Sequence, residues 1–88
     1  MKTIVILGSN GSIGTNTLDI VDRFPEEFRV VGLTAGSNDE KLEAQIRRFK
    51  PRVVALSDTA AAARLQERCE DLPVEILSGQ EGLIQVAC

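Results

Sequence analysis

The chain has 88 residues, which is enough for one domain at most, and its 43% hydrophobic and 26% charged residues are an ordinary globular composition. A net charge of −3 argues against nucleic acid or an anionic membrane as a general partner. There is no histidine, and the two cysteines, Cys69 and Cys88, have no metal or redox spacing, which excludes zinc sites and histidine-based catalysis within these residues.

No segment of the sequence predicts insertion into a membrane or export. No apolar run approaches the roughly 18–20 residues that a membrane-spanning helix needs. Met1 and Lys2 lead straight into an apolar, strand-like run, which is not how a signal peptide begins. We therefore expect a cytoplasmic protein with no membrane partner and no nucleic-acid partner.

The first predicted element is the strand Ile4–Leu7, a short apolar run rich in β-branched residues. Three glycines follow at three-residue spacing, Gly8, Gly11 and Gly14, and from Ile13 onward the apolar period becomes helical. A buried strand that turns through glycines into a helix presents the unpaired N–H groups of the helix N-terminus to an anion. The pattern favours a phosphate-binding turn.

Each glycine has a physical reason for its position in such a turn. Gly8 allows the tight turn, Gly11 lets the backbone approach a pyrophosphate, and Gly14 lets the helix pack close to the sheet. The spacing differs from the commoner G-x-G-x-x-G, and no Gly-Lys-Ser/Thr follows as it does in a triphosphate loop. A glycine turn without a ligand is the alternative, and the strand before it and the helix after it favour nucleotide binding.

The first predicted helix, Ser12–Phe24, is amphipathic and ends at Pro25. The residues expected on its buried face are Ile13, Thr17, Ile20, Val21 and Phe24. A strand over Phe28–Ala35 follows, and then a helix over Asp39–Phe49 that buries Leu42, Ile46 and Phe49, with Ser37 or Asn38 as its cap.

The second half of the chain repeats this alternation. It begins with a strand over Arg52–Leu56 and a helix, capped by Ser57 or Asp58, that points Ala61, Leu65 and Cys69 inward. A short strand over Val74–Leu77 comes next, and Ser78 with Glu81 forms a predicted capping box for a last helix.

Alternating short strands and helices predict an α/β fold, a Rossmann-like doubly wound parallel sheet with helices on both faces, present here as a partial domain. We expect the strand order 3-2-1, with the fourth strand beside the first and with strands 1–3 the most buried. The glycine turn then lies at the carboxyl end of the first strand, where such sheets bind ligands.

The residues after the second strand predict which dinucleotide is bound. Dinucleotide folds usually place an Asp or Glu there to bind the ribose diol, but this chain has no carboxylate before Asp39. Gly36, Ser37 and Asn38 offer small polar groups at a helix N-terminus, which suit a 2′-phosphate and favour NADP over NAD. Helix capping alone is the alternative role for Ser37 and Asn38. Asp39 is expected to point toward solvent.

No residues form an evident acid–base pair or activated nucleophile, so no catalytic residue is assigned. Asp19 and Asp22 lie three apart on a helix and are expected on its solvated face. The residues therefore predict a cofactor-binding half domain that needs a substrate domain elsewhere.

Several strings together resemble the amino terminus of the 1-deoxy-D-xylulose 5-phosphate reductoisomerase family, along essentially the whole chain. The strings are Leu7–Gly14 (LGSNGSIG), Thr17–Asp19, Phe28–Val31, Ala35–Asn38, Pro51–Arg52 and Leu77–Gly79. The resemblance implies that the family's cofactor residues correspond to Asn10, Gly11, Ser12, Ile13, Gly36, Ser37 and Asn38. Position 10 is often Thr in the family, and position 37 is Lys in some members.

The resemblance also implies an activity for the full-length protein. Members of the family rearrange 1-deoxy-D-xylulose 5-phosphate and reduce it with NADPH to 2-C-methyl-D-erythritol 4-phosphate in the non-mevalonate isoprenoid pathway, as homodimers that use Mg²⁺ or Mn²⁺. Their metal and sugar-phosphate residues lie beyond position 88, so no metal ligand is assigned here and the chain alone is expected to be inactive. The catalytic and C-terminal domains are expected to lie outside it.

Two alternatives remain at this point. One is another NAD(P)-dependent Rossmann reductase of the semialdehyde dehydrogenase or dihydrodipicolinate reductase type, which would need a nucleophilic cysteine or a basic cluster downstream. The other is a non-catalytic nucleotide-sensing module, which would bind the cofactor alone.

Overall fold

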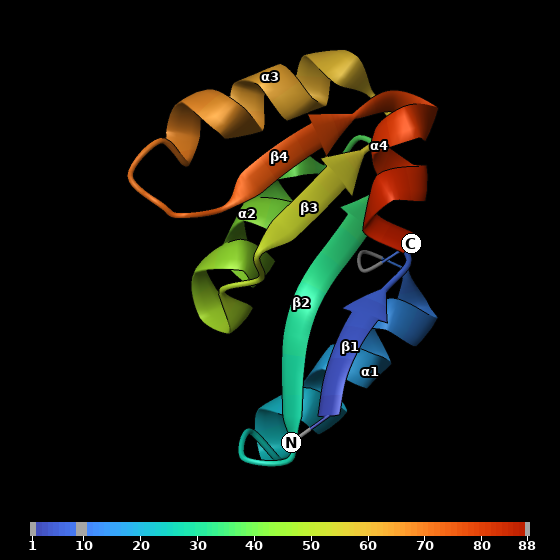
Figure 1. The fold of residues 1–88 in the computed structure, drawn as a ribbon, viewed down its shortest axis with the longest axis vertical. Helices are drawn as coiled ribbons and strands as arrows, with labels where there is room; N and C mark the ends of the chain where they lie inside the picture. The colour runs from blue at the N-terminus through green and yellow to red at the C-terminus, as the bar shows by residue number, and fades with distance from the viewer. Residues whose placement is uncertain (1, 9–10, 88) are drawn as a thin grey trace.

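The computed structural model describes residues 2–8 and 11–87, with positions 12, 13 and 87 described by their backbone alone. Over these residues strands and helices alternate along the chain (Figure 1). The strands are β1 (Lys2–Ile6), β2 (Phe28–Ala35), β3 (Val53–Leu56) and β4 (Glu75–Ser78). The helices are α1 (Ser12–Arg23), α2 (Asp39–Phe49), α3 (Thr59–Arg68) and α4 (Gly79–Ala87).

Most element bounds agree with the sequence patterns to within a residue, and those of β2 and α2 are as predicted. The first strand differs more, because it begins at Lys2 and ends at Ile6 rather than running from Ile4 to Leu7. Lys2 and Thr3 pair in register with the first residues of β2, so main-chain pairing extends the strand beyond its apolar run. Leu7 belongs instead to the turn.

The four strands form one parallel sheet in the order β1-β2-β3-β4. The predicted neighbours β1, β2 and β3 are confirmed, but the expectation that the fourth strand lies beside the first is wrong, since β4 pairs with β3. Right-handed crossovers that proceed in one direction keep their helices on one face of the sheet. The periodicity of α3 predicts its buried side but not which sheet face it covers, so the sequence left the place of β4 undetermined.

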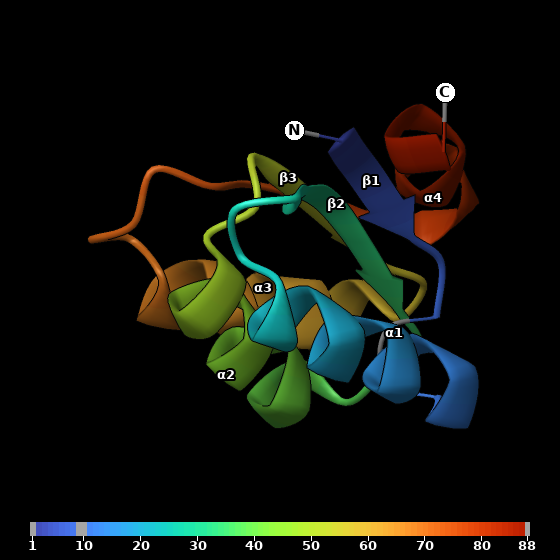
Figure 2. The ribbon, with the colours of Figure 1, turned by 90° about the horizontal axis from the view of Figure 1, so that it is seen from below.

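Helices cover both faces of the sheet, as predicted. Helices α1, α2 and α3 lie on one face, and α4 lies on the other (Figure 2). Gly32 of β2 makes room for α4, because a Cβ built on it would lie 2.9 Å from Cγ1 of Val86. The change of face therefore comes at α4, after β4.

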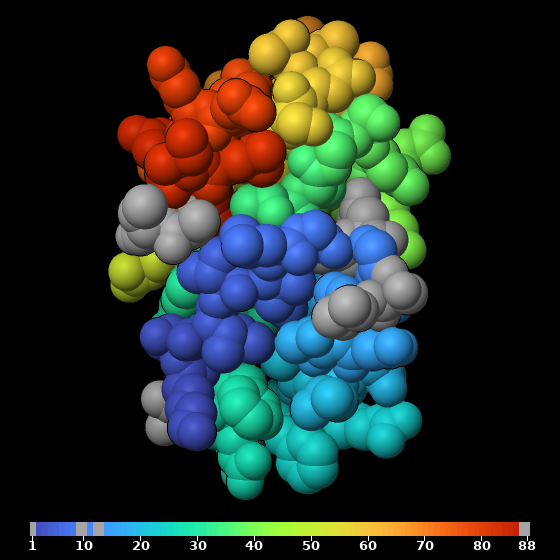
Figure 3. All heavy atoms as spheres, turned by 90° about the vertical axis from the view of Figure 1, so that its right-hand side faces the viewer, coloured from blue at the N-terminus to red at the C-terminus, as the bar shows by residue number. Residues whose placement is uncertain are grey.

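The core lies mainly between β2, β3 and the three helices of the first face. Its fully buried large side chains are Leu33, Leu42, Ile46, Val54, Leu56 and Leu65. Strands 1–3 were expected to be the most buried, and β1 is the least buried of these three, with only Ile6 buried, while β4 has no buried residue. Figure 3 shows β1 at the surface between α1 and α4.

The predicted inner face of α1 is right for Val21, and Thr17 is half-buried, but the prediction is wrong for Ile20 and Phe24. Leu18 and Val21 are buried, whereas Ile20 and Phe24 are 51% and 50% exposed. Two apolar stripes lie side by side on this helix: the predicted one, and one through Gly14, Leu18 and Val21. They are about 100° apart, because each residue turns an α-helix by that angle. The stripe that contains the buried Gly14 packs on the sheet, since the absence of a side chain lets the backbones approach.

The predicted inner faces of α2 and α3 are confirmed. Leu42 and Ile46 of α2 are fully buried and Phe49 is half-buried. In the α3 segment Ala61, Leu65 and Cys69 are all buried. Cys88 lies outside the described residues. Among the residues that are described, no helix is long and apolar enough to cross a membrane.

Candidate nucleotide-binding site

Two turns meet at the carboxyl edge of the sheet. The first follows β1 and contains Gly8 and Gly11; the second follows β2 and contains residues 36–38. They are joined directly, because the N–H of Gly8 donates a 2.8 Å hydrogen bond to Oγ1 of Thr34 near the end of β2. Since β1 and β2 are parallel and hydrogen-bonded neighbours, the sheet fixes both turns at the same edge.

The residues after β3 support the second turn from its other side. The N–H of Ser57 donates to the carbonyl of Ala35 (3.0 Å), and the N–H of Asp58 donates to the carbonyl of Gly36 (3.1 Å). A Cβ built on Gly36 would lie 3.8 Å from Oγ of Ser57, an ordinary contact. The conformation of this turn is therefore set by main-chain bonds from the neighbouring turn.

Gly8 has the turn conformation predicted for it. Gly8 has φ of +71°, a left-handed conformation that other residues rarely adopt, and its carbonyl accepts a 2.9 Å bond from the N–H of Gly11. Gly11 is the N-cap of α1 and has no side chain with which to cap it. No side chain at Gly11 competes with an anion for the backbone N–H groups at the start of α1, as a phosphate site requires.

The other predicted residues of this turn are placed as follows. Ser12 and Ile13 form the start of α1, and Gly14 is buried in its first turn. Asn10 lies outside the described residues. The structure thus brings Gly8, Gly11 and the start of α1 together in one turn.

In the second turn Gly36, Ser37 and Asn38 are all exposed. Asn38 is the cap of α2, since its Oδ1 accepts a 3.1 Å bond from the N–H of Lys41. The expected capping role is confirmed for Asn38 rather than Ser37. Ser37 lies one residue before the cap and is exposed, a position that suits contact with an anion.

Asp39 does not point toward solvent, and that expectation is wrong. It is 7% exposed and forms ion pairs with two arginines of α3. Its carboxylate lies 3.2 Å from Nη2 of Arg64 and 2.7 Å from Nη2 of Arg68. These hydrogen bonds, that of Arg68 foremost, lower the pKa of Asp39 below its ordinary value. The carboxylate turns across to α3 because two cations are there to receive it.

The two ion pairs of Asp39 belong to a larger network of charged side chains between α2 and α3. Glu43 contacts Nε of Arg68 at 2.5 Å and Nε of Arg47 at 3.1 Å. Arg47 also lies 3.7 Å from Asp71. The hydrogen bond from Arg68, followed by that from Arg47, lowers the pKa of Glu43. Three carboxylates and three guanidinium groups therefore balance one another beside the second turn.

Sequence reasoning missed Thr34, Arg64 and Arg68 as parts of this region. A signal existed for the arginines, because Asp39 and Glu43 lie four apart on one helix and Arg64 and Arg68 lie four apart on the next. The two acidic residues on one helix can therefore pair with the two basic residues on the neighbouring helix. No comparable signal identified Thr34, whose role depends on the register of β1 against β2.

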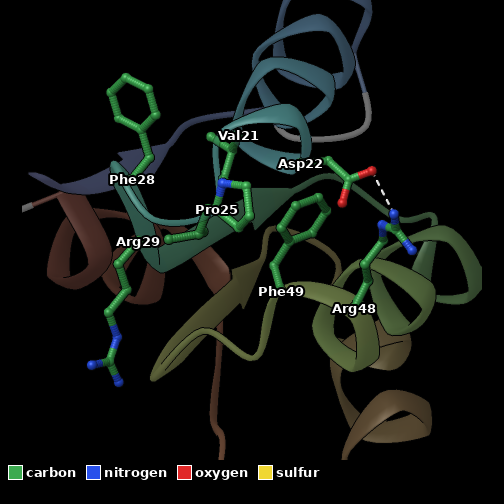
Figure 4. Close-up of a pocket in the computed structure, with 8 residues that line it drawn as sticks. Val21, Asp22, Pro25, Phe28, Arg29, Arg48 and Phe49 are labelled. Carbon is green, nitrogen blue, oxygen red and sulfur yellow. Dashed lines mark hydrogen bonds and ion pairs between the residues drawn. The ribbon is translucent and has the colours of Figure 1, made fainter. Parts of the chain in front are cut away.

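A cavity at the amino edge of the sheet is separate from the two turns. A cavity of about 230 Å³ lies between the end of α1, the start of β2 and the end of α2. Figure 4 shows Pro25 and Phe49 in its wall beside the ion pair between Asp22 and Arg48. Because Phe28 is the first residue of β2, this cavity is at the amino end of the strands, away from both glycine turns.

The described residues offer no catalytic constellation. None of their histidine, cysteine, aspartate and glutamate side chains form a group of three or more that could hold a metal ion. Burial raises the pKa of the Cys69 thiol, which makes it a poor nucleophile. Asp19 and Asp22 lie on the exposed side of α1, as predicted.

Comparison with known proteins gives a consistent result across the chain. A family model described as 1-deoxy-D-xylulose 5-phosphate reductoisomerase matches residues 4–88. Relatives of that name include one from Desulfitobacterium hafniense (strain Y51), 51% identical over 85 residues, and one from Anaeromyxobacter sp. (strain K), 54% identical over 88 residues. These alignments cover 97% and 99% of this chain but 22% of each relative.

Solved structures agree with the sequence matches. A crystal structure of DOX-P reductoisomerase in complex with NADPH, fosmidomycin and magnesium is 38% identical with a TM-score of 0.92, covering 99% of this chain and 22% of that one. The enzyme from Zymomonas mobilis in complex with NADPH is 30% identical with a TM-score of 0.92, covering 98% and 23%. The chain thus spans under a quarter of the length of the proteins it matches.

Proposed function

Because the chain belongs to the 1-deoxy-D-xylulose 5-phosphate reductoisomerase family, we propose that residues 1–88 form the N-terminal part of an NADP-binding Rossmann domain in such an enzyme. The observation that carries this proposal is the hydrogen bond between Gly8 and Thr34, which holds the two turns together. One turn then faces the pyrophosphate and the other faces the adenosine ribose of a single dinucleotide.

The turn after β1 would bind the pyrophosphate. Its proposed residues are Gly8, Asn10, Gly11, Ser12, Ile13 and Gly14. Main-chain N–H groups at the start of α1 are the donors, and the partial positive charge of the helix N-terminus adds to their attraction. Gly11 supports this role, since a side chain there would lie between the backbone and the phosphates.

The turn after β2 would bind the 2′-phosphate that distinguishes NADPH from NADH. Its proposed residues are Gly36, Ser37 and Asn38. The hydroxyl of Ser37 and main-chain N–H groups beside the cap of α2 can donate to phosphate oxygens. The carboxylate of Asp39, which would repel the phosphate, is paired with arginines instead.

The full-length protein would rearrange and reduce 1-deoxy-D-xylulose 5-phosphate, as the names of its relatives indicate. The product would be 2-C-methyl-D-erythritol 4-phosphate, as the family resemblance implies. NADPH would supply the hydride, and Mg²⁺ or Mn²⁺ would hold the substrate through residues outside this chain. We propose a cytoplasmic homodimer without nucleic-acid or membrane partners. The match over residues 4–88 favours this family over a semialdehyde dehydrogenase, a dihydrodipicolinate reductase or a sensing module.

Kinetics of the full-length protein test this function. We expect NADPH oxidation that depends on 1-deoxy-D-xylulose 5-phosphate and on a divalent cation, and a lower KM for NADPH than for NADH. The 88-residue chain alone should show no such turnover. Turnover by the isolated chain, or equal affinity for both cofactors in the full-length protein, would contradict the proposal.

A further inference from the structure

Asp39 places a negative charge beside the turn that the proposed function assigns to the 2′-phosphate. It is two residues after Ser37, so the two Cα atoms lie within about 7.6 Å of each other, twice the spacing of consecutive Cα atoms. That separation is inside the screening length of about 8 Å at physiological salt. An unpaired carboxylate at this position would therefore repel a bound 2′-phosphate dianion.

The carboxylate is instead held by two guanidinium groups from a helix about 25 residues further along the chain. One oxygen lies 3.2 Å from Nη2 of Arg64, and the other lies 2.7 Å from Nη2 of Arg68. The Asp39 side chain is 10% exposed, while those of Arg64 and Arg68 are 54% and 36% exposed. Both oxygens are thus engaged on the α3 side by guanidinium groups that are themselves partly exposed.

We propose that Arg64 and Arg68 are specificity-determining residues that favour NADPH by neutralising Asp39 next to the 2′-phosphate site. They act through Asp39 and are positioning residues. The inference rests on the proposed function, because it presumes that residues 36–38 face the 2′-phosphate. NADH has no such phosphate, so its binding should be insensitive to the same charges.

The chain offers a matched control in Arg47. It belongs to the same network, contacts Glu43 at 3.1 Å and Asp71 at 3.7 Å, and donates a 3.2 Å hydrogen bond to the carbonyl of Arg68. The ion pairs of Asp39 are with Arg64 and Arg68 instead. Removing Arg47 removes one cation between α2 and α3 without exposing the charge of Asp39. Glu43, in turn, keeps its contact with Arg47 when Arg68 is replaced.

The experiment is a titration of the full-length protein with NADPH and with NADH, for the wild type and four variants. The variants are Arg64→Gln/Arg68→Gln, Arg47→Gln, Asp39→Asn, and the triple variant Asp39→Asn/Arg64→Gln/Arg68→Gln. We expect the double variant to bind NADPH about tenfold more weakly, about 1.4 kcal/mol, and NADH as before. Arg47→Gln should change neither affinity by more than about twofold, and the triple variant should regain most of the NADPH affinity.

Recovery of NADPH affinity on adding Asp39→Asn would distinguish this role from direct contact with the phosphate and from a purely structural role. If NADPH binding stays weak in the triple variant, the arginines contact the phosphate themselves and the proposal is wrong. If NADPH and NADH weaken together and the melting temperature falls, the arginines only hold α2 against α3, which also overturns it. A wild-type protein without preference for NADPH would refute the proposed function, whereas a preference that survives in the double variant would refute this inference alone.

Discussion

The two turns differ in how the helix after each of them begins: α1 starts after Gly11 without a side-chain cap, whereas side chains cap the start of α2 and neutralise its first carboxylate. In the first, Gly8 and Gly11 bond to each other, and no side chain of Gly11 covers the start of α1. In the second, Asn38 caps α2 and Asp39 is held by arginines of α3. The pyrophosphate is common to NADPH and NADH, and backbone N–H donors are enough to bind it. Selection of NADPH by its 2′-phosphate depends instead on the balance of charges around the second turn.

This difference predicts how substitutions should behave. Changes in the first turn should weaken both cofactors, because both contain the pyrophosphate. Changes in the second turn should weaken NADPH alone. Variants of the full-length protein can test this difference.

Replacement of Gly11 by Val should weaken NADPH and NADH by at least tenfold. The side chain would project where the pyrophosphate approaches the backbone, and each charge-assisted hydrogen bond lost is worth about 1.5–3 kcal/mol. The change is compatible with the fold, since Gly11 has φ of −79° and its Cβ would lie 3.4 Å from the carbonyl oxygen of Gly8. Titration measures the affinities, and unchanged values would mean that this is a turn without a ligand.

Replacement of Ser37 by Asp should weaken NADPH about tenfold, or ~1.4 kcal/mol, and leave NADH unchanged. The new carboxylate would face the 2′-phosphate without the arginine partners that Asp39 has. Ser37→Asn is the matched control, because it adds similar volume without charge. Equal loss for both cofactors would show that residues 36–38 do not discriminate the phosphate.

Replacement of Gly8 by Ala should cost about 1–2 kcal/mol of folding stability, because a left-handed φ strains any residue with a Cβ. The cost comes from the backbone alone, since the new Cβ would have no atom within 4 Å. Gly36→Ala is the comparison, because its Cβ would make an ordinary 3.8 Å contact with Ser57. Thermal melting should show a lower midpoint for Gly8→Ala than for Gly36→Ala; similar midpoints would contradict the assigned strain.

The contrast between the turns also explains what the sequence could predict. Gly8, Gly11 and the start of α1 lie within one short segment, so the local pattern was sufficient to predict their geometry. Asp39 was wrongly expected in solvent because its partners, Arg64 and Arg68, lie on another helix. The prediction for the place of β4 was wrong because it depends on which sheet face α3 covers, and the prediction for α1 was partly wrong because two apolar stripes compete to face the sheet.

Replacement of Thr34 by Val should separate the two turns while keeping the shape of the side chain. The N–H of Gly8 loses its 2.8 Å acceptor, which should destabilise the protein by about 1 kcal/mol and weaken both cofactors a few fold. Thr3→Val in β1 is the control, since that residue is exposed and far from the turn. Equal behaviour of the two variants in melting and titration would mean that the hydrogen bond between the turns contributes little.

The smallest effect should be a loss of stability in acid that depends on Asp39. Its pKa is lowered in the folded protein, with Arg68 the first cause and Arg64 the second, so the unfolded chain takes up its proton at higher pH. The stabilisation by this pair is therefore complete above the unfolded pKa and is lost as pH falls through the folded pKa. Asp39→Asn removes the titrating group, so its melting midpoint should lie below that of the wild type at neutral pH and approach it as pH falls below about 4. Glu43, whose pKa is lowered in the same way, is present in both proteins, so its loss of stability in acid is common to both except for the part that depends on Arg68, the partner it shares with Asp39. A difference in midpoint that stays constant between pH 7 and pH 3 would show that Asp39 contributes through packing rather than through its charge.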